Sequence, residues 1–407
     1  MRRARLRVKS QTGFVPIVVA FLLLLSRVAS AAHHEVLACV GAKVYPSPTA
    51  VPLEDAVLVI EDGKIQALTP RGGGHRDVPG SAVKLDCTGK FVVAGFWNSH
   101  VHFENGWAHA ATAPASELET HLQEMLTRWG FTTVWDLGSE TGNTLALRAR
   151  VDSGEVPGPR ILMAGNMFPK NGHPVYLPPE MQLPEAATPG AARQLAERYM
   201  GLGLDGVKLF TGAYMGARPV INMDSAIVQA AVKVAHAHDK PVFAHPQNHI
   251  GVDNALAGGV DILAHTIPTE GSFTEAELQR MKQQHTALIP TLSLWTTVVE
   301  DRAAAAGLVQ AGANELKSYF SNGGTILFGT DVGFTTKYDT GQEYEFMARA
   351  MGWSDILASL TTNPSRFFEA ATKGRIEKGM DADPATDVRN LSKVAYTIRG
   401  GRIIYRE

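Results

Sequence analysis

Two histidines one residue apart end an apolar run in the sequence FVVAGFWNSHVHF, which spans residues 91–103. Residues i and i+2 of a β-strand point to the same side, so His100 and His102 can direct imidazole nitrogens at one metal ion. Two ordinary histidines on a surface or in a core would give the same short pattern. The rest of the chain must decide between these interpretations.

Four more residues of the types that bind metals stand at or near the ends of apolar segments. They are Lys208 in DGVKLF, His245 at the end of PVFAH, His265 at the end of DILAH and Asp331 at the end of TILFGTD. Burying a polar group without a hydrogen-bond partner is costly, so a set of this size needs something that satisfies all its members. A divalent metal ion is the simplest such partner.

These residues fall within a regular alternation of strands and helices between residues 94 and 371. Eight segments are predicted strands: VVAGFWNSH, FTTVWDLG, RILMAGN, DGVKLF, PVFAH, DILAH, ALIPTL and TILFGTD. The segments between them, such as MDSAIVQAAVKVAHAHD, carry apolar residues at helical spacing. We therefore predict an α/β fold, a (β/α)8 TIM barrel with its active site at the carboxyl ends of the strands. A doubly wound open sheet is the alternative, but no glycine-rich phosphate loop follows an early strand.

Short strand-like segments lie on both sides of the predicted barrel. Residues 33–93 contain VLACVGAKVY, AVLVIEDGKIQAL and AVKLDCTGKFVV, and residues 372–407 contain VAYTIRGGRIIY. The Asp62-Gly63 and Gly400-Gly401 pairs are turn signals within these segments. Neither part has enough strands to bury a core alone, so we predict one small β-sandwich domain built from both chain ends.

Residues 1–32 have the pattern of a signal peptide. A basic start precedes an apolar stretch at residues 14–25, which is too short to span a bilayer comfortably, and the small residues Ala29, Ser30 and Ala31 follow. We expect an exported protein, periplasmic or secreted, that meets the membrane only through this peptide. An uncleaved anchor is the alternative.

The composition argues against nucleic acid as a partner. The formal net charge is −2, and no basic patch with interleaved aromatic residues occurs. Cys39 and Cys87 both precede the predicted barrel. They either form a disulfide in an oxidising compartment or remain two buried thiols, and neither is assigned to catalysis. The sequence leaves open whether the chain forms a homo-oligomer.

The motifs taken together resemble the amidohydrolase superfamily, specifically its imidazolonepropionase-like and prolidase-like (Xaa-Pro dipeptidase-type) branch. The similarity rests on motifs in the same order along the chain: AGFWNSHVHF, GVKLF, FAHPQN, ALAGGVDILAHT, FGTDVG and TTNPSRFFEAATKGRIEKGMDAD. The resemblance implies two divalent metal ions, with zinc favoured. It implies that one ion binds His100, His102 and Asp331, that the other binds His245 and His265, and that Lys208, carboxylated to a carbamate, bridges them.

The carbamate gives Lys208 a chemistry that a bare lysine lacks. An ammonium group repels a divalent ion and has no free lone pair, whereas a carbamate offers two anionic oxygens. The alternative is a lysine that forms a salt bridge beside a mononuclear centre of the imidazolone-hydrolase kind.

Asp331 is the predicted catalytic base. A metal can lower the pKa of bound water from about 15.7 to near 7, and Asp331 would take the proton of this nucleophile and pass it to the leaving amine. We therefore predict a hydrolase that cleaves an amide bond of a small molecule, with a dipeptide or an N-acyl amino acid favoured. The alternatives are a cyclic-amide or lactone hydrolase and, without catalysis, a periplasmic metal-binding scaffold.

Substrate contacts are predicted in the loops after the third and fourth strands. FPKNGHPVYLPPE offers His173 and Tyr176, and TGAYMGARP offers Tyr214 and Arg218. Tyr214 could donate to a developing oxyanion, and Arg218 could pair with a substrate carboxylate.

One departure from the family pattern lies in the last part of the chain. Relatives usually read GxDADLVVLD before the final strands, but here DAD runs directly into PATDVRNLSKV. The sequence therefore predicts that about one strand of the small β-domain is missing, with effects on folding or stability before effects on chemistry.

Overall fold

The computed structural model describes residues 36–72, 78–104, 109–381, 384–386 and 391–407. The signal peptide predicted at residues 1–32 lies outside these ranges. Within them, every helix is too short or too polar to span a lipid bilayer.

A parallel sheet of seven consecutive strands forms most of a barrel. The strands are β6 (Phe96–Val101), β7 (Phe131–Asp136), β8 (Arg160–Pro169), β10 (Gly206–Leu209), β13 (Val242–Ala244), β14 (Ile262–Leu263) and β15 (Ala287–Leu288), and they pair in this order. β6, β7, β10 and β13 are buried along their whole length. Continuous burial is expected in a barrel, where one face of each strand fills the interior and the other contacts the helices.

Residues 325–332 close the barrel between the last strand and the first. Leu288 of β15 pairs in parallel with Ile326, and Val101 of β6 pairs in parallel with Val332. The predicted (β/α)8 barrel is therefore confirmed. Its eighth segment differs from the other strands because it pairs through isolated bridges and not through a continuous ladder.

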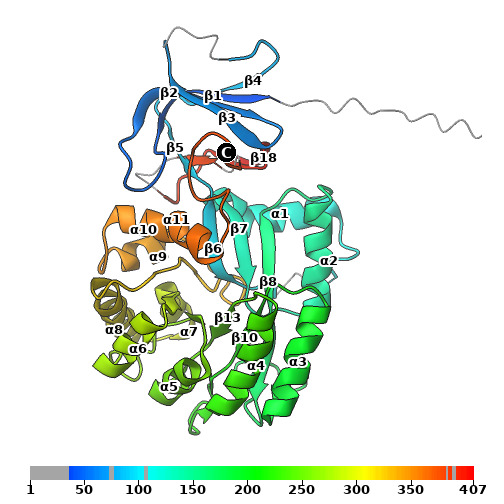
Figure 1. The fold of residues 1–407 in the computed structure, drawn as a ribbon, viewed down its shortest axis with the longest axis vertical. Helices are drawn as coiled ribbons and strands as arrows, with labels where there is room; N and C mark the ends of the chain where they lie inside the picture. Colours follow the sequence, from blue (N-terminus) through cyan, green and yellow to red (C-terminus); the bar gives the residue numbers. More distant parts are fainter. Residues whose placement is uncertain (1–35, 73–77, 105–108, 382–383, 387–390) are drawn as a thin grey trace, which may run out of the picture. The chain divides into compact units, whose positions relative to one another are not determined.

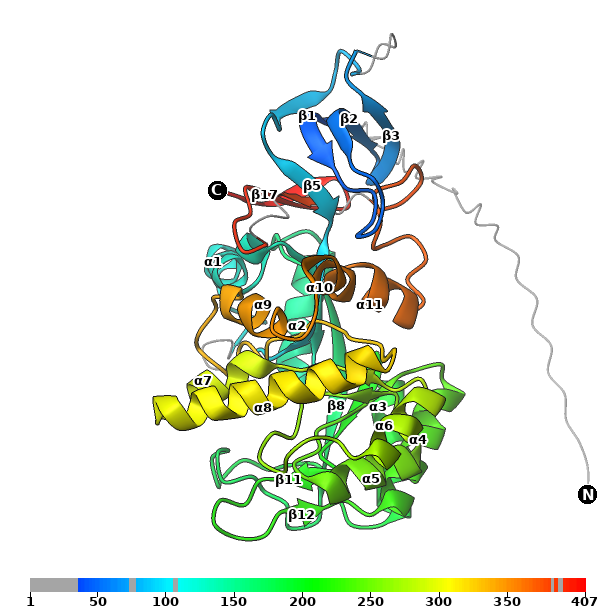
Figure 2. The ribbon, with the colours of Figure 1, turned by 90° about the vertical axis from the view of Figure 1, so that its left-hand side faces the viewer.

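Helices follow the strands of this sheet along the chain. They are α1 (Ala115–Met125), α2 (Thr141–Asp152), α3 (Pro189–Gly201), α4 (Ser225–Ala237), α5 (His249–Gly258), α6 (Glu275–Gln283), α7 (Trp295–Val298), α8 (Arg302–Ser321), α9 (Gly341–Met347), α10 (Trp353–Leu360) and α11 (Thr362–Phe367). α2 and α3 pack on β8, and α4 packs on β10 (Figure 1). Among the described helices α8 is the longest, with 20 residues (Figure 2).

Several of these helices begin at a residue whose side chain caps the first turn. The Thr188 side chain accepts a hydrogen bond from Ala191 N at the start of α3, and Pro189 occupies the first helical turn. At the start of α6, Thr274 and Glu277 form a reciprocal capping box. These caps fix the points at which the loops above the barrel end.

Strands from both chain ends share one branched sheet. They are β1 (Leu37–Val44), β2 (Leu53–Glu61), β3 (Lys64–Pro70), β4 (Val83–Asp86), β5 (Phe91–Ala94), β16 (Pro384–Thr386), β17 (Tyr396–Arg399) and β18 (Arg402–Arg406). Their order is β18-β17-β16-β5-β1-β2-β3, and β4 pairs with β1. The small β-sandwich domain predicted from both chain ends is therefore confirmed as a β-structure that both ends share, and its described strands pair in one branched sheet.

β16 corrects the expectation of a missing strand. It pairs antiparallel with β5 on one side and with β17 on the other. The strand is shortened to three residues but still fills its place between them.

Cys39 of β1 and Cys87, just after β4, form a disulfide, with their Cα atoms 5.7 Å apart. Both residues are buried. The bond ties together β1 and β4, which also pair through a parallel ladder. The structure thus selects the disulfide from the two states that the sequence left open.

The motif that carries the histidine pair also joins the two sheets. The predicted strand VVAGFWNSH divides at Gly95, so that β5 belongs to the small sheet and β6 to the barrel. The C-terminal hairpin also contacts the barrel, because the Thr397 hydroxyl donates to Thr127 O over 2.6 Å. The position of the histidines is therefore supported from both sheets.

Candidate metal centre

A cavity of about 370 Å³ opens beside the carboxyl ends of the barrel strands, and its wall contains all the predicted metal ligands. These are His100, His102, Lys208, His245, His265 and Asp331. β10 contains Lys208, and His245 and His265 follow the last paired residues of β13 and β14. Asp331 directly precedes Val332, which pairs with Val101 of β6. The fold thus gathers side chains that are far apart in the sequence.

His100, His102 and Asp331 converge on one another. His100 Nε2 lies 3.3 Å from His102 Nε2, and Asp331 Oδ1 lies 3.1 Å from the first nitrogen and 2.8 Å from the second. Two ligand atoms about 2.0 Å from a tetrahedral zinc ion are themselves about 3.3 Å apart. The triangle therefore has the size that one metal ion of this class requires.

Asp331 Oδ1 has the character of a metal ligand. This oxygen is buried and has no partner with hydrogen-bond geometry in the described part of the chain. Burial opposes ionisation of the carboxyl group, but the neighbouring imidazoles of His100 and His102 outweigh it and hold the pKa of Asp331 well below its usual range. A buried anionic oxygen without a hydrogen bond is costly, and a divalent cation would satisfy it. The residues present therefore fit a metal ion.

His265 and His245 adjoin this triangle. The ring centroids of His100 and His265 are 4.8 Å apart, and those of His265 and His245 are 4.6 Å apart. Burial, followed by the charge of Lys208, lowers the pKa of His245 to about 3. Burial also holds the pKa of His265 well below its usual range. Both imidazoles are therefore neutral and carry the lone pair that a metal ion needs.

Lys208 is almost completely buried in the cavity wall. Burial lowers the pKa of its amine to about 7, against the opposing attraction of Asp331. A substantial fraction of the side chain is then a neutral amine at neutral pH, and a neutral amine can act as a nucleophile. This is the form that carboxylation by carbon dioxide requires.

Two glycines bring the FGTDVG motif against the histidine strand. A Cβ atom on Gly333 would lie 1.7 Å from His102 O, and one on Gly329 would lie 2.9 Å from His100 Cβ. Asp331 itself has a positive φ of 60°, which is uncommon for a residue with a side chain. The small residues of this motif therefore allow the carboxylate to reach both imidazoles.

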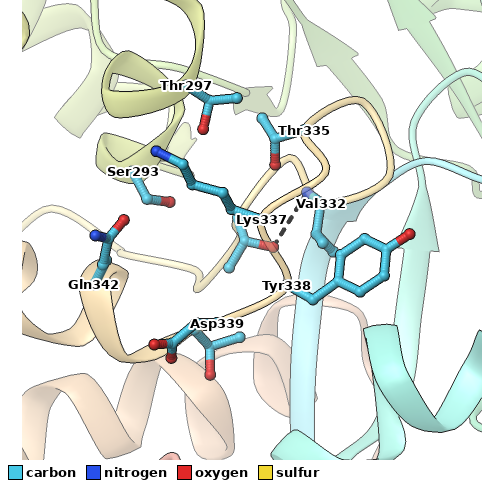
Figure 3. A pocket seen from close by; sticks show the side chains of 10 residues that line it. Ser293, Thr297, Val332, Thr335, Lys337, Tyr338, Asp339 and Gln342 are labelled. Atoms are coloured by element: carbon cyan, nitrogen blue, oxygen red, sulfur yellow. Dashed lines mark hydrogen bonds between the residues drawn. The ribbon is translucent and has the colours of Figure 1, made fainter.

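A buried asparagine connects the same two segments. Asn98 Nδ2 donates to Thr330 Oγ1 over 2.8 Å, and Asn98 Oδ1 accepts from His100 N at 3.2 Å and from Thr330 N at 3.3 Å. Val332 N also donates to Thr330 Oγ1, over 3.3 Å (Figure 3). Sequence reasoning missed Asn98, although a polar residue inside an apolar strand, two positions before His100, was a usable signal.

A second, much smaller pocket lies beside the closing segment (Figure 3). Its volume is about 10 Å³, and its lining includes Val332, Thr335 and Tyr338. Lys337 Nζ, which also lines it, donates to Thr296 O over 2.9 Å. A space of this size holds about one water molecule, so it is too small for a substrate.

Thr291 determines which nitrogen of His265 faces the cavity. Thr291 Oγ1 lies 2.7 Å from His265 Nδ1 and donates its own proton to Pro290 O over 2.9 Å. The hydroxyl must therefore accept from Nδ1–H, which leaves the lone pair on His265 Nε2. Thr291 reaches this position with a φ of 47°, a strained conformation for a β-branched residue.

Two buried glutamates hold the loops that follow the sixth and seventh strands. Glu343 accepts hydrogen bonds from Leu292 N at 2.9 Å and Ser293 N at 2.7 Å, next to the strained turn. Glu315 Oε2 accepts from Ile267 N over 2.8 Å. Burial raises the pKa of Glu343 to about 7 and that of Glu315 to about 8. These carboxyl groups position backbone and stand outside the cavity wall.

The predicted substrate residues separate into two pairs. Tyr176 and Tyr214 line the cavity, but His173 and Arg218 are not part of its wall. The ring nitrogens of His173 lie 3.1 and 3.3 Å from carbonyl oxygens of its own loop, and Arg218 is exposed. The sequence placed both residues in the correct loops but could not give the direction of their side chains.

Sequence reasoning missed most of the apolar cavity wall. The loops after the third and seventh strands contribute Leu177, Met181, Leu183, Leu294, Trp295, Val298 and Val299. It also missed two polar groups in the wall, Asn166 and Glu104. Asn166 Oδ1 is buried without a hydrogen-bond partner among the residues described, and burial raises the pKa of Glu104.

The sequence pattern of the amidohydrolase family matches residues 91–404, which include the whole barrel and its converging side chains. The chain belongs to the amidohydrolase family. As a member of this family it is a hydrolase that acts on carbon–nitrogen bonds, as predicted. The family is generally metal-dependent, in agreement with the group formed by His100, His102 and Asp331.

Several solved structures resemble this amidohydrolase over nearly their full length. A putative prolidase from Bifidobacterium longum has a TM-score of 0.78 and 23% identity, and the match covers 91% of this chain and 95% of that chain. A Xaa-Pro dipeptidase with bound methionine has a TM-score of 0.75 and 21% identity, and the match covers 92% of this chain and 100% of that chain. The ochratoxinase of A. niger has a TM-score of 0.73 and 18% identity, and the match covers 92% of this chain and 96% of that chain. At these identities the likeness shows the fold alone. No curated protein sequence matches the chain.

Proposed function

We propose that this amidohydrolase cleaves an amide bond of a small molecule at a centre of two divalent metal ions. The convergence of His100 Nε2, His102 Nε2 and Asp331 Oδ1 within 3.3 Å carries this proposal. When bound, the metal ions supply hydroxide at neutral pH and polarise the scissile carbonyl. Zinc is the favoured ion because imidazole, the donor of four of the six residues, suits it, and because no thiolate is present, manganese and cobalt accept the same ligands.

The six converging residues divide into two groups of ligands in this proposal. His100, His102 and Asp331 would hold one ion, and His245 and His265 would hold the other. Lys208 would join the two groups as a carbamate. Its burial and its lowered pKa support this role, because both favour the neutral amine that attacks carbon dioxide.

Asp331 acts as the base in the reaction. Its lowered pKa keeps it ionised at neutral pH, so it can take the proton of the nucleophile and deliver it to the leaving nitrogen. Tyr214 lines the cavity, and in this proposal it would donate a hydrogen bond to the developing oxyanion. Dipeptides and N-acyl amino acids are the first substrates to assay, since the resembling structures include a putative prolidase and a Xaa-Pro dipeptidase.

We also propose that the protein works outside the cytoplasm. The predicted signal peptide at residues 1–32 carries this part of the proposal. The disulfide between Cys39 and Cys87 supports it, because such bonds persist in oxidising compartments.

Asp331→Asn tests the proposed function. The variant should keep its fold, while amide turnover falls by at least the roughly 100-fold that follows loss of a general base. Asp253→Asn, on the exposed side of α5, is a matched control that should keep full turnover. Metal content is measured beside activity for both variants. Absence of amide turnover by the zinc-loaded wild type, across libraries of dipeptides, N-acyl amino acids and uncharged amides, would refute the proposal.

A further inference from the structure

Exposed apolar side chains gather at the mouth of the cavity. Tyr176 is 40% exposed, Met181 43%, Tyr214 43% and Val298 46%, and all of them belong to its wall. They come from three separate segments: the loop after β8, the loop after β10, and α7. A group of exposed apolar residues around one opening in a protein surface usually marks a binding site.

The interior of the cavity continues this apolar surface with aromatic rings. Phe168 and Phe210 stack with their centroids 4.0 Å apart, and Tyr176 meets Phe334 edge to face with centroids 5.3 Å apart. Trp295 also belongs to the wall. The rings come from β8 itself and from the loops after several strands, so a substrate above the metal centre would be surrounded by apolar surface.

The described part of the wall offers no cation for a substrate carboxylate. It contains no arginine, and Lys208 is its one lysine, which the proposed metal bridge uses. Outside the predicted ligands, the charged side chain in this part of the wall is Glu104, which is acidic. Arg218, which the sequence suggested for a carboxylate, is exposed and outside the wall.

We propose that the substrate is an uncharged amide with large apolar or aromatic groups on both sides of the scissile bond. This inference rests on the proposed function and narrows it. A free carboxylate at either end would lose its hydration in the cavity without a cation to pair with, which is costly. An apolar ring in the same place would gain contact with the aromatic wall. The enzyme therefore discriminates against free dipeptides and N-acyl amino acids in favour of neutral amides.

Matched pairs of anilides test this inference. N-benzoyl-4-methylaniline and N-benzoyl-4-aminobenzoate each contain one amide bond and differ by a methyl group against a carboxylate on the leaving half. A second pair, N-(4-methylbenzoyl)aniline and its 4-carboxybenzoyl counterpart, moves the charge to the acyl half. The neutral member of each pair should have a kcat/KM at least tenfold higher, mainly through KM. Equal or faster turnover of a carboxylate member would overturn the inference.

Binding measurements separate this inference from the proposed function. Calorimetry with the zinc-loaded protein should show the neutral anilides bound at least tenfold more tightly than their carboxylates. If the neutral anilides bind tightly but no amide is cleaved, the proposed function fails and the inference stands. If amides are cleaved but the carboxylate anilides bind as tightly as the neutral anilides, the proposed function stands and the inference fails.

A charge placed at the rim should reverse the preference. Val298→Arg introduces a cation in the cavity wall at a side chain that is already partly exposed, so the fold should tolerate it. The ratio of kcat/KM for the neutral and carboxylate anilides should shift toward the carboxylate by at least tenfold. Leu202→Arg, 45% exposed at the end of α3 and outside the wall, is the matched control and should leave the ratio unchanged. A folded Val298→Arg variant with the wild-type ratio would contradict the inference.

Discussion

Asn98 Nδ2 donates a 2.8 Å hydrogen bond to Thr330 Oγ1, and this bond fastens the strand of the histidine pair to the segment that ends at Asp331. Asn98 is fully buried, and its carbonyl oxygen also accepts from the backbone nitrogen of His100. One side chain therefore fixes the distance between metal ligands on two strands that are adjacent in the barrel but distant in the sequence.

Asn98→Ala should weaken the metal centre without removing a ligand. Loss of an outer partner of this kind typically costs about 10- to 100-fold in metal affinity, and a buried unsatisfied group costs about 1–3 kcal/mol of stability. Zinc affinity is measured by competition with a chromogenic chelator, and stability by urea unfolding. Thr330→Ser retains the hydroxyl and should keep most of the affinity. Wild-type zinc affinity in Asn98→Ala would contradict the proposed connection.

Thr291→Val should weaken metal binding by His265 without changing the other candidate ligands. Valine keeps the β-branched shape but removes the hydroxyl 2.7 Å from His265 Nδ1, so the tautomer is no longer fixed. We expect about a tenfold or greater loss of affinity for one of two zinc ions, seen as a weakened second step in a zinc titration. Thr291→Ser is the conservative variant and should restore that step. An unchanged titration in Thr291→Val would show that the hydroxyl does not orient the imidazole.

Metal loading should depend on dissolved carbon dioxide if Lys208 is carboxylated. Apoprotein reconstituted in bicarbonate-free buffer should recover two ions and activity slowly and incompletely, and added bicarbonate should complete the recovery. Lys208→Ala should lose one ion, which acetate or propionate partly restores by supplying bridging oxygens. Lys208→Met fills the space of the lysine methylene chain, so acetate and propionate should not restore the lost ion in this variant. Two ions and a normal rate in the Met variant would make the lysine a bystander.

Glu315 should make stability depend on pH. Burial raises the pKa of this carboxyl from its ordinary 4.5 to about 8, so the folded protein holds a proton that the unfolded chain has released. The free energy of unfolding therefore falls as pH rises through this window. Glu315→Gln resembles the protonated acid and lacks this loss, so its stability relative to the wild type should increase between pH 5 and pH 8. Urea unfolding of both proteins in excess chelator checks this, and a difference that is constant with pH would contradict it.

The sequence could predict the strands and the polar residues that gather in the cavity wall because both follow local rules. Apolar runs end in His100, His245, His265 and Asp331. These residues are expected at the active site, because the carboxyl end of a barrel strand lies there. Even the eighth segment was predicted, although it pairs by isolated bridges. The turn at Gly400-Gly401 followed in the same way from residue type.

The supporting contacts could not be predicted because they join residues distant in sequence. Nothing near Asn98 identifies Thr330 as its partner, and nothing near Thr291 indicates a positive φ or a contact with His265. The direction of loop side chains such as Arg218 could not be predicted for another reason. Residue type gave a chemistry for this side chain, but its direction depends on how the whole loop packs.

The pairing of β5 with β16 affects how the chain can be made. β5 is complete by residue 94, but its second neighbour begins at residue 384, so one edge of the first sheet stays unpaired until almost the whole chain has been synthesised. An open edge of this kind invites pairing with other chains. The two cysteines lie at residues 39 and 87, both early in the chain, so oxidation can lock β1 to β4 before the barrel exists. The disulfide would thereby hold β1 beside β4 while the edge of β5 is still without β16.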